Sequence, residues 1–277
     1  MEYNQEYFKD ILPKRFEDSH KGIFGHVLNI AGSEFYTGAA YFSSVAPLKV
    51  GCGLVTLASV ETALKAVSTL CPDIILMPLS KIKNETFNNF QAVSIGCGLS
   101  SEKNAIKLFK KILKLLKNSQ IPFVIDADGL NILSGLKNFD LPSKTVLTPH
   151  PKEMARLMDV SVENILEQPA FWVKKCCEKY NCTMVLKLHK TIMGDNQGNS
   201  YVNNTGNSAL AHGGSGDVLC GMISGFLAQG LNPFEASCLG VYLHGLTGEI
   251  ASKELTEYSV LASDLLSYIP KAIKSIL

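Results

Sequence analysis

The chain lacks any excess of charge of one sign. It has 26 Lys and Arg residues against 25 Asp and Glu residues, which gives a formal net charge of +1. Proteins that bind nucleic acid or an anionic membrane surface usually carry a strongly basic field, and this composition supplies none. We therefore expect neither nucleic acid nor a membrane as a partner.

Long apolar runs are also missing. The first ten residues are polar and aromatic, unlike a signal peptide, and no stretch reaches the roughly 20 apolar residues that a membrane-spanning helix needs. We expect a cytoplasmic protein. The eight cysteines form no Cys-x-x-Cys pair and have no histidine beside them at metal-ligand spacing, so we interpret them as reduced thiols, most of them in the core.

Several familiar phosphate and metal motifs do not occur. The chain has no G-x-x-x-x-G-K-[ST], no G-x-G-x-x-G and no G-x-S-x-G segment. Asp126 and Asp128 match the start of a calcium-binding loop, but Leu130 and Lys137 stand where such a loop needs ligands. Classical P-loop, kinase-loop and calcium-loop chemistry is thereby excluded.

What the chain does contain is the composition of a globular protein with a large core, since 46% of its residues are hydrophobic and 18% are charged. From about residue 27, short β-branched runs alternate with helical patterns, which is typical of βαβ units around a mainly parallel sheet. The predicted strands are Val27–Ala31, Leu54–Ala58, Ile74–Met77, Ala92–Ile95, Phe123–Asp126, Thr145–Leu147, Met184–Lys187, Ile192–Gly194 and Ser200–Val202.

Helical patterns fill the intervals between these strands. Nothing resembling a linker or a repeat divides the chain, so we expect one three-layer α/β/α domain over residues 1–277. Ligands of such sheets gather at the carboxyl ends of the strands. The predicted helices are Gly38–Val50, Glu102–Leu116, a stretch after Glu163, Val218–Gln229, Pro233–Ala251 and a last helix from about Ala262.

The most informative segment is Gly213-Gly214-Ser215-Gly216-Asp217, which leads directly into an apolar helical pattern. The first N–H groups of a helix have no intrahelical partner, and glycines allow a phosphate to approach them closely. Asp217 could be only an N-cap, but a cap does not need three nearby glycines. The segment therefore predicts a phosphate site.

A carboxylate beside a phosphate site repels the phosphate but can accept a proton from a substrate hydroxyl that attacks it. We therefore predict that Asp217 is a general base. The backbone around Gly214 and Gly216 would stabilise the charge that develops on the transferred group.

Seven segments, in this order, resemble one known family. They are Lys21-Gly22 with Gly25-His26-Val27 and Ile30 to Ser33; Gly38-Ala39-Ala40; Val50 to Val55; Gly96 to Leu99; Asp126 to Asn131; Thr148 to Glu153; and Gly213 to Leu219. The family is the ADP- or ATP-dependent NAD(P)H-hydrate dehydratases, members of the ribokinase-like superfamily. The resemblance runs through nearly the whole chain.

The resemblance implies a repair reaction. Family members convert the S epimer of hydrated NADH or NADPH (NADHX or NADPHX) back to the reduced cofactor, and they couple this dehydration to hydrolysis of ADP to AMP and phosphate, or of ATP. It also implies magnesium as a cofactor and a homo-oligomer such as a tetramer. The chain has no room for the epimerase domain that some relatives carry, so either the epimerase is a separate protein or the epimers interconvert spontaneously.

The resemblance also implies site residues. Ala40, Gly98, His150 and Asp217 would contact the hydrated nicotinamide nucleotide, and Glu153 with Asp126 would assist magnesium. The adenine nucleotide would be held by Lys187, Leu188, His189, Lys190, Thr191 and Gly216.

Most of these residues have a purely structural alternative. Ala40 could pack on the sheet, His150 could make a structural hydrogen bond, and Glu153 could be a first-turn helix acid. Lys187 could be a strand-end charge that reaches solvent. We expect Asp128 to cap the helix that follows it.

The chain departs from the usual family pattern in two places that concern the nucleotide. The usual Lys-Gly-x-x-Thr is Lys187-Leu188-His189-Lys190-Thr191, and the usual Pro-Gly-Glu is Pro151-Lys152-Glu153. Two rival functions remain at this point: a ribokinase-like kinase of a vitamin precursor, which would make a stable phosphate ester, and a nucleotide-binding sensor without turnover. The sequence does not show whether ADP or ATP is the preferred co-substrate.

Overall fold

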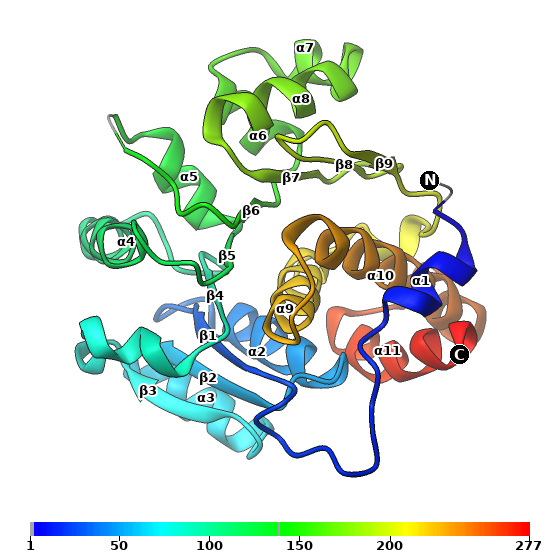
Figure 1. Ribbon diagram of the computed structural model, residues 1–277, viewed down its shortest axis with the longest axis horizontal. Helices are drawn as coiled ribbons and strands as arrows, with labels where there is room; N and C mark the ends of the chain where they lie inside the picture. The colour runs from blue at the N-terminus through cyan, green and yellow to red at the C-terminus, as the bar shows by residue number, and fades with distance from the viewer. Residues whose placement is uncertain (1–2, 138) are drawn as a thin grey trace.

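A computed structural model describes residues 3–137 and 139–277 and contains one nine-stranded sheet in the order β3-β2-β1-β4-β5-β6-β7-β8-β9 (Figure 1). The nine strands expected from the sequence are all present, with ends that differ by one residue at most. Their bounds are β1 His26–Ile30, β2 Leu54–Ser59, β3 Ile75–Pro78, β4 Ala92–Ile95, β5 Phe123–Ile125, β6 Thr145–Leu147, β7 Thr183–Leu186, β8 Ile192–Gly194 and β9 Ser200–Val202.

The sheet is parallel from β3 through β7, and only β8 and β9 run antiparallel to their neighbours. Strand β1 pairs with β2 on one side and with β4 on the other. The chain therefore adds β2 and β3 on one side of β1 and then reverses, adding β4 to β9 on the other side. Ligand sites in such sheets lie beyond the carboxyl ends of the strands, near the point of reversal. The predicted strand-end segments therefore share one edge of the sheet.

Helices connect and cover the strands. The single helix expected after Glu163 is two helices, because Pro169 begins a new one, and four helices were not assigned bounds in advance: α1, α3, α5 and α6. The bounds are α1 Gln5–Ile11, α2 Thr37–Lys49, α3 Glu61–Leu70, α4 Lys103–Leu116, α5 Asp128–Ser134, α6 Pro151–Met158, α7 Val162–Glu167, α8 Pro169–Tyr180, α9 Ser215–Ala228, α10 Pro233–Leu255 and α11 Ala262–Ile276, with short 3-10 helices at Leu79–Lys81, Asn84–Asn89 and Ser208–Leu210.

Both faces of the sheet are covered, as the expected α/β/α arrangement requires. Alternate residues of β1 point to opposite faces: Val27 belongs to one buried cluster, whereas Leu28 and Ile30 belong to the other. Figure 1 shows α2, α9, α10 and α11 gathered on one side and α4 to α8 on the other. The three-layer fold class is confirmed.

Helix α9 lies at the centre of the first of these helical layers and is buried almost all round. It contacts α2, α10, α11 and the strands β4, β1 and β5. Gly221 and Gly225 allow α2 to approach, since a Cβ at either would lie 2.8 Å or less from Ala46 or Pro47. This packing fixes the direction of α9, whose first turn lies at the carboxyl edge of the sheet.

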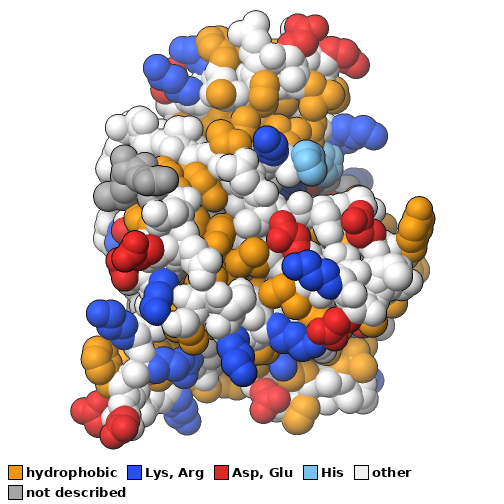
Figure 2. Space-filling view, turned by 90° about the vertical axis from the view of Figure 1, so that its right-hand side faces the viewer, with side chains coloured by type: hydrophobic (Ala, Val, Ile, Leu, Met, Phe, Trp, Pro, Cys, Tyr) orange, Lys and Arg blue, Asp and Glu red, His pale blue; other side chains and the backbone are white. Residues whose placement is uncertain are grey.

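Figure 2 shows basic, acidic and hydrophobic side chains interspersed over one face of the molecule, in keeping with the net charge of +1. Within residues 3–137 and 139–277, none of the helices combines the length and the hydropathy that a bilayer crossing requires.

Candidate active site

The first turn of α9 is open to an incoming anion. Gly214 is the N-cap residue and has φ +93°, a left-handed conformation that glycine adopts at little cost, and no side chain caps the helix. A Cβ on Gly213 would meet no atom within 4 Å, and one on Gly216 would meet only the Lys187 Nζ, at 3.5 Å. The start of α9 thus combines backbone N–H groups that no side chain caps with room for a ligand, as a phosphate site requires.

Asp217 is the third residue of α9 and not its N-cap, so the helix begins three residues earlier than the sequence predicted and the capping alternative for Asp217 is wrong. Its side chain is partly buried. Burial raises the pKa of Asp217 to about 6, and the nearby Asp126 carboxylate adds to the shift, while Cys97 and Lys187 oppose it. A carboxylate with this pKa is a better proton acceptor near neutral pH than an ordinary Asp.

Lys187 follows β7 directly and turns into the protein. Its Nζ lies 2.8 Å from Asp126 Oδ1 and 4.0 Å from Glu153 Oε2, and only 20% of its side chain is exposed. Burial alone would lower the pKa of Lys187, but the carboxylates of Asp126 and Glu153 outweigh it and the pKa is raised. The alternative in which Lys187 merely reaches solvent is wrong. The side chain instead holds a fixed positive charge against Gly216 at the start of α9.

His150 and Glu153 cap helix α6 reciprocally. The Nδ1 of His150 accepts the backbone N–H groups of Lys152 at 3.1 Å and Glu153 at 3.3 Å, and the Glu153 Oε2 accepts the N–H of His150 at 2.9 Å. Both structural alternatives for these residues are therefore confirmed. Because Nδ1 accepts, the ring proton of neutral His150 lies on Nε2, 3.3 Å from Glu153 Oε1.

Burial controls the charge of both capping residues. It raises the pKa of Glu153 to about 7, although the ammonium of Lys187 opposes the shift. It also lowers the pKa of His150, and Lys187 acts in the same direction. Near neutral pH the histidine is uncharged and Glu153 titrates.

A cleft of about 830 Å³ opens beside Lys187 and the start of α9. Six residues predicted for substrate or nucleotide line it: His150, Lys187, Leu188, His189, Thr191 and Gly216. Lys190, Gly214 and Asp217 do not line it, although Gly214 and Asp217 belong to the same helix start. The structure thus brings most of the predicted nucleotide residues together.

The loop after β7 closes without the glycine that the family pattern contains. The hydroxyl of Thr191 donates to the Leu188 carbonyl at 3.1 Å and accepts the Leu188 N–H at 3.4 Å. No residue from 187 to 191 has a positive φ. Leu188 is therefore unstrained in the position of the missing glycine.

The other wall of the cleft was not predicted from the sequence, apart from Gly213 and Ser215 of the glycine-rich segment. It is formed by residues 203–213 and by α10, and its residues are Asn203, Thr205, Gly206, Asn207, Ser208, Leu210, Ala211, His212, Gly213, Val241, His244 and Gly245, with Ser215 and Leu219 of α9. The polar, turn-rich composition between the last strand and the glycine-rich segment was the available signal.

This wall is held by hydrogen bonds to α10. The Thr205 hydroxyl donates to the Tyr242 carbonyl at 2.9 Å, and the Gly206 N–H donates to Glu249 at 2.7 Å. Ser215 Oγ lies 3.2 Å from His244 Nε2, and burial lowers the pKa of His244 to about 4, so this histidine is neutral near pH 7. The start of α9 is thereby tied to α10.

The remaining predicted substrate residues lie on the β1, β4 and α2 side of the site. Gly98 has φ +61°, and a Cβ there would lie 2.7 Å from the Cβ of Tyr36. Ala40 has no solvent-accessible surface and packs against Gly32, so the packing alternative for Ala40 holds. Its contact with a substrate stays a prediction, and such a contact requires some movement of α2. Ser33 Oγ is buried and has no hydrogen-bond partner among the described residues.

Asp128 does not cap the helix that it begins, so that expectation is wrong. Its Oδ2 accepts the N–H of Ser100 at 2.8 Å, and the N-cap of α5 is Ala127, at φ +47°. Because Ser100 belongs to the loop after β4, Asp128 joins two strand-end loops instead.

Asp126 and Glu153 do not offer magnesium a free pair of oxygens. Asp126 Oδ1 pairs with Lys187 and its Oδ2 lies 3.9 Å from the Cys97 Sγ, while both oxygens of Glu153 face His150. Mg²⁺ needs near-octahedral oxygen ligands and usually takes several of them from water and substrate phosphates. The residues as arranged do not fit a magnesium site, and their metal role stays a prediction.

The sheet order, the three layers and the uncapped glycine-rich helix define a ribokinase-like α/β protein. Within that class, the chain belongs to the NAD(P)H-hydrate dehydratase family, whose model matches residues 27–271.

Individual relatives agree with this assignment. The chain is 35% identical to the ADP-dependent (S)-NAD(P)H-hydrate dehydratase of Neisseria meningitidis over 94% of this chain and 87% of that protein. It is 34% identical to a bifunctional NAD(P)H-hydrate repair enzyme of Moorella thermoacetica over 96% of this chain but 52% of that protein, so it spans about half the length of this bifunctional relative. A crystal structure of the ADP/ATP-dependent NAD(P)H-hydrate dehydratase of Bacillus subtilis, co-crystallised with ATP and Mg²⁺, superposes with a TM-score of 0.90 at 28% identity, covering 99% of this chain and 98% of that one.

Proposed function

We propose that this protein dehydrates the S epimers of NADHX and NADPHX to NADH and NADPH and couples the reaction to hydrolysis of ADP, to AMP and phosphate, or of ATP. Family membership and the names of the relatives support this activity. The observation that carries the proposal is the carboxylate of Asp217 in the first turn of an uncapped helix, with Lys187 beside the same turn.

The chemistry follows from the difference between two leaving groups, because hydroxide leaves carbon with difficulty and phosphate leaves readily. Asp217 removes the proton of the C6 hydroxyl, and the oxygen attacks the terminal phosphorus of the nucleotide. The P–O bond to the nucleotide breaks and a C6 phosphate ester forms. The ring nitrogen then pushes an electron pair toward C6, the C6–O bond breaks, inorganic phosphate departs and loss of the C5 proton restores the double bond.

The residues around the cleft have separate tasks in this proposal. The ammonium of Lys187 and the N–H groups of the α9 first turn stabilise negative charge on the transferred phosphoryl group. The loop Leu188 to Thr191 lies against the nucleotide, and the uncharged His150 supplies a polar Nε2–H at the cleft wall. Gly98 and Ala40 border the hydrated nicotinamide, as the family resemblance implies.

Some expectations from the sequence extend beyond the site. A separate epimerase would supply the S epimer from the R epimer, which is consistent with bifunctional relatives of about twice this length. The cytoplasmic location, the homo-oligomeric state and the single domain over residues 1–277 stay predictions.

The decisive experiment is a turnover assay with purified (S)-NADHX or (S)-NADPHX and either ADP or ATP. The proposal expects recovery of the reduced-nicotinamide absorbance together with one inorganic phosphate per cofactor restored. Accumulation of a stable phosphate ester without recovered absorbance would establish the kinase instead. Nucleotide binding without turnover of either kind would establish the sensor. Running both nucleotides in parallel measures the co-substrate preference.

A further inference from the structure

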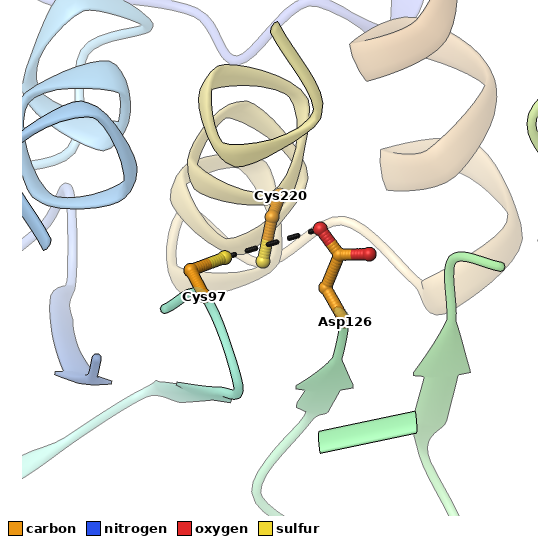
Figure 3. A group of neighbouring side chains, drawn as sticks. All are labelled: Cys97, Asp126 and Cys220. Carbon is orange, nitrogen blue, oxygen red and sulfur yellow. Dashed lines mark hydrogen bonds between the residues drawn. The ribbon is translucent and has the colours of Figure 1, made fainter. Parts of the chain in front are cut away.

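The side chains of Cys97, Cys220 and Asp126, all of ligand type, converge on one another (Figure 3). The Sγ atoms of Cys97 and Cys220 and a carboxylate oxygen of Asp126 all lie within 4.8 Å of one another, and the Cys97 Sγ is 3.9 Å from Asp126 Oδ2. The three residues come from the loop after β4, the second turn of α9 and the end of β5. Each is at most 1% exposed, so the cluster is shielded from bulk water.

This donor set selects a particular class of ion. Two sulfur ligands and one carboxylate suit Zn²⁺ and other thiophilic divalent cations, whereas Mg²⁺ and Ca²⁺ prefer oxygen alone. In a tetrahedral zinc site with Zn–S bonds of about 2.3 Å, neighbouring ligand atoms lie about 3.8 Å apart. The observed cluster needs to contract by about 1 Å at most.

We infer that Cys97, Cys220 and Asp126 form a binding site for a thiophilic divalent cation such as Zn²⁺, and that its occupation opposes nucleotide binding at Lys187. Binding releases the two thiol protons to solvent and leaves two zinc-bound thiolates, so no oxidant or reductant is needed.

The opposition arises because Asp126 is shared between the two sites. Its Oδ1 holds the Lys187 Nζ at 2.8 Å, and that ion pair keeps the ammonium beside the start of α9. A cation bound to the same carboxylate competes with Lys187 for its negative charge. The two thiolates balance the charge of the cation, so the ion pair with Lys187 is weakened by this competition for Asp126. The effect on nucleotide affinity rests on the proposed role of Lys187, whereas the binding of the metal does not.

The first test measures metal binding without any turnover. The intact protein, prepared without metal, is titrated with Co²⁺, whose thiolate complexes absorb in the near ultraviolet, and with Zn²⁺ in competition with a chromophoric chelator. We expect one ion per chain with a thiolate-to-cobalt band. Cys220→Ala and Cys97→Ala should each bind at least tenfold more weakly, while Cys238→Ala, which removes a buried cysteine of α10 outside the cluster, should bind like the wild type. Absence of the band from the wild type, or its persistence in both cluster variants, overturns the site.

The second test separates the site from its consequence. Equilibrium binding of ADP and ATP is measured with and without one equivalent of Zn²⁺, and we expect Zn²⁺ to weaken nucleotide binding at least tenfold in the wild type and in Cys238→Ala but not in Cys220→Ala. Equal nucleotide affinity at full zinc occupancy overturns the coupling, even if the cobalt band is present. If the loss of nucleotide binding appears only with peroxide and is reversed by a thiol reductant, a Cys97–Cys220 disulfide replaces the metal site.

Discussion

Helices α6 and α9 both begin at the carboxyl edge of the sheet, and both carry an acidic residue as their third residue, yet their first turns are used in opposite ways. In α6, the imidazole of His150 and the carboxylate of Glu153 satisfy the free backbone groups of the first turn. In α9, the N-cap is a glycine and Asp217 caps nothing. When side chains of the protein accept the first backbone N–H groups of a helix, that helix start is purely structural. When those N–H groups are left free, they are available to a ligand.

The two acids also share one cation unequally. Lys187 Nζ is 4.0 Å from a Glu153 oxygen and lies against Gly216, two residues after the α9 N-cap. Burial raises the pKa of Glu153 to about 7 and that of Asp217 to about 6. A raised pKa alone therefore does not identify the base, because the pKa of the capping acid is raised as well. What distinguishes Asp217 is that its carboxylate does not cap its helix, whereas that of Glu153 does.

The largest effect is expected for Asp217→Asn, which removes the proton acceptor and keeps the shape. Turnover should fall about a hundredfold or more with nucleotide affinity nearly unchanged. Steady-state kinetics with direct binding measurements test this. Glu153→Gln is the matched variant in α6, and the comparison breaks if it loses as much turnover as Asp217→Asn.

The Asn variant should also be more stable than the wild type at pH 7. The folded pKa of about 6 exceeds the ordinary 3.8, so the wild type loses stability as the pH rises from about 4 through 6. Denaturant unfolding at pH 7 should show a gain on the order of 1–3 kcal/mol for the variant. An Asn variant that is less stable than the wild type at that pH would contradict the burial of an ionised carboxylate.

Lys187→Gln tests the shared cation. The substitution leaves Asp126 and Glu153 buried without their positive partner, so we expect a loss of on the order of 2 kcal/mol in the free energy of unfolding, less than for a fully buried pair. The KM for the nucleotide should rise at least tenfold. Lys174→Gln, at an exposed position of α8, is the control. Unchanged nucleotide affinity in Lys187→Gln would remove Lys187 from the site.

Gly214→Ala probes the conformation that keeps the α9 start open. An alanine at φ +93° is strained, and its Cβ would lie 2.7 Å from the Cβ of Ala262, so we expect a loss of about 1–2 kcal/mol in stability. Gly213→Ala should unfold at nearly the wild-type denaturant concentration, since its Cβ meets no atom within 4 Å. Equal destabilisation of the two variants would contradict the distinction between the glycines.

The pH profile separates the two acids. If Asp217 is the base, kcat/KM rises with pH and levels off above about 6, since the protonated form is inactive and its population falls as the pH passes the pKa. Below that pH the rate should drop about tenfold per unit. The Glu153→Gln variant should show the same decline of kcat/KM at acid pH. If this decline disappears in Glu153→Gln, the group whose protonation stops the reaction is Glu153 and not Asp217.

The smallest effect concerns the capped helix. His150→Ala removes the side-chain acceptor at the α6 N-cap and should cost about 1 kcal/mol of stability, whereas His150→Asn keeps a good N-cap and should cost little. If His150 also contacts the substrate, both variants raise the KM for NADHX. Thermal unfolding together with kinetics separates the two roles, and a normal KM in both variants would leave only the cap.

The strands could be predicted because each combines a β-branched run with a following turn residue, which is a local signal. Helix α3, at Glu61–Leu70, was missed because Ala63, Leu64 and Val67 are its only buried residues and the pattern is short. The helix expected after Glu163 was predicted as one, although Pro169 starts a second.

The features of the site also divide into those with a local sequence signal and those without one. The glycine-rich turn is a local pattern and was predicted in place, with the exception of the helix start. The ion pair between Lys187 and Asp126 joins residues 61 positions apart, and the wall formed by residues 203–213 depends on hydrogen bonds to α10. Such contacts depend on the tertiary arrangement of the elements. Lys187 and Asp126 could therefore be predicted as site residues but not as partners of each other, and most of the wall was not predicted.

The loop after β7 closes through the hydroxyl of Thr191 and needs no residue in the left-handed region. The backbone at position 188 therefore does not require glycine, and Leu188 lines the cleft. Sequence drift at that one position alters the surface offered to a bound base or sugar while the loop keeps its shape, so co-substrate selectivity and foldability can evolve independently.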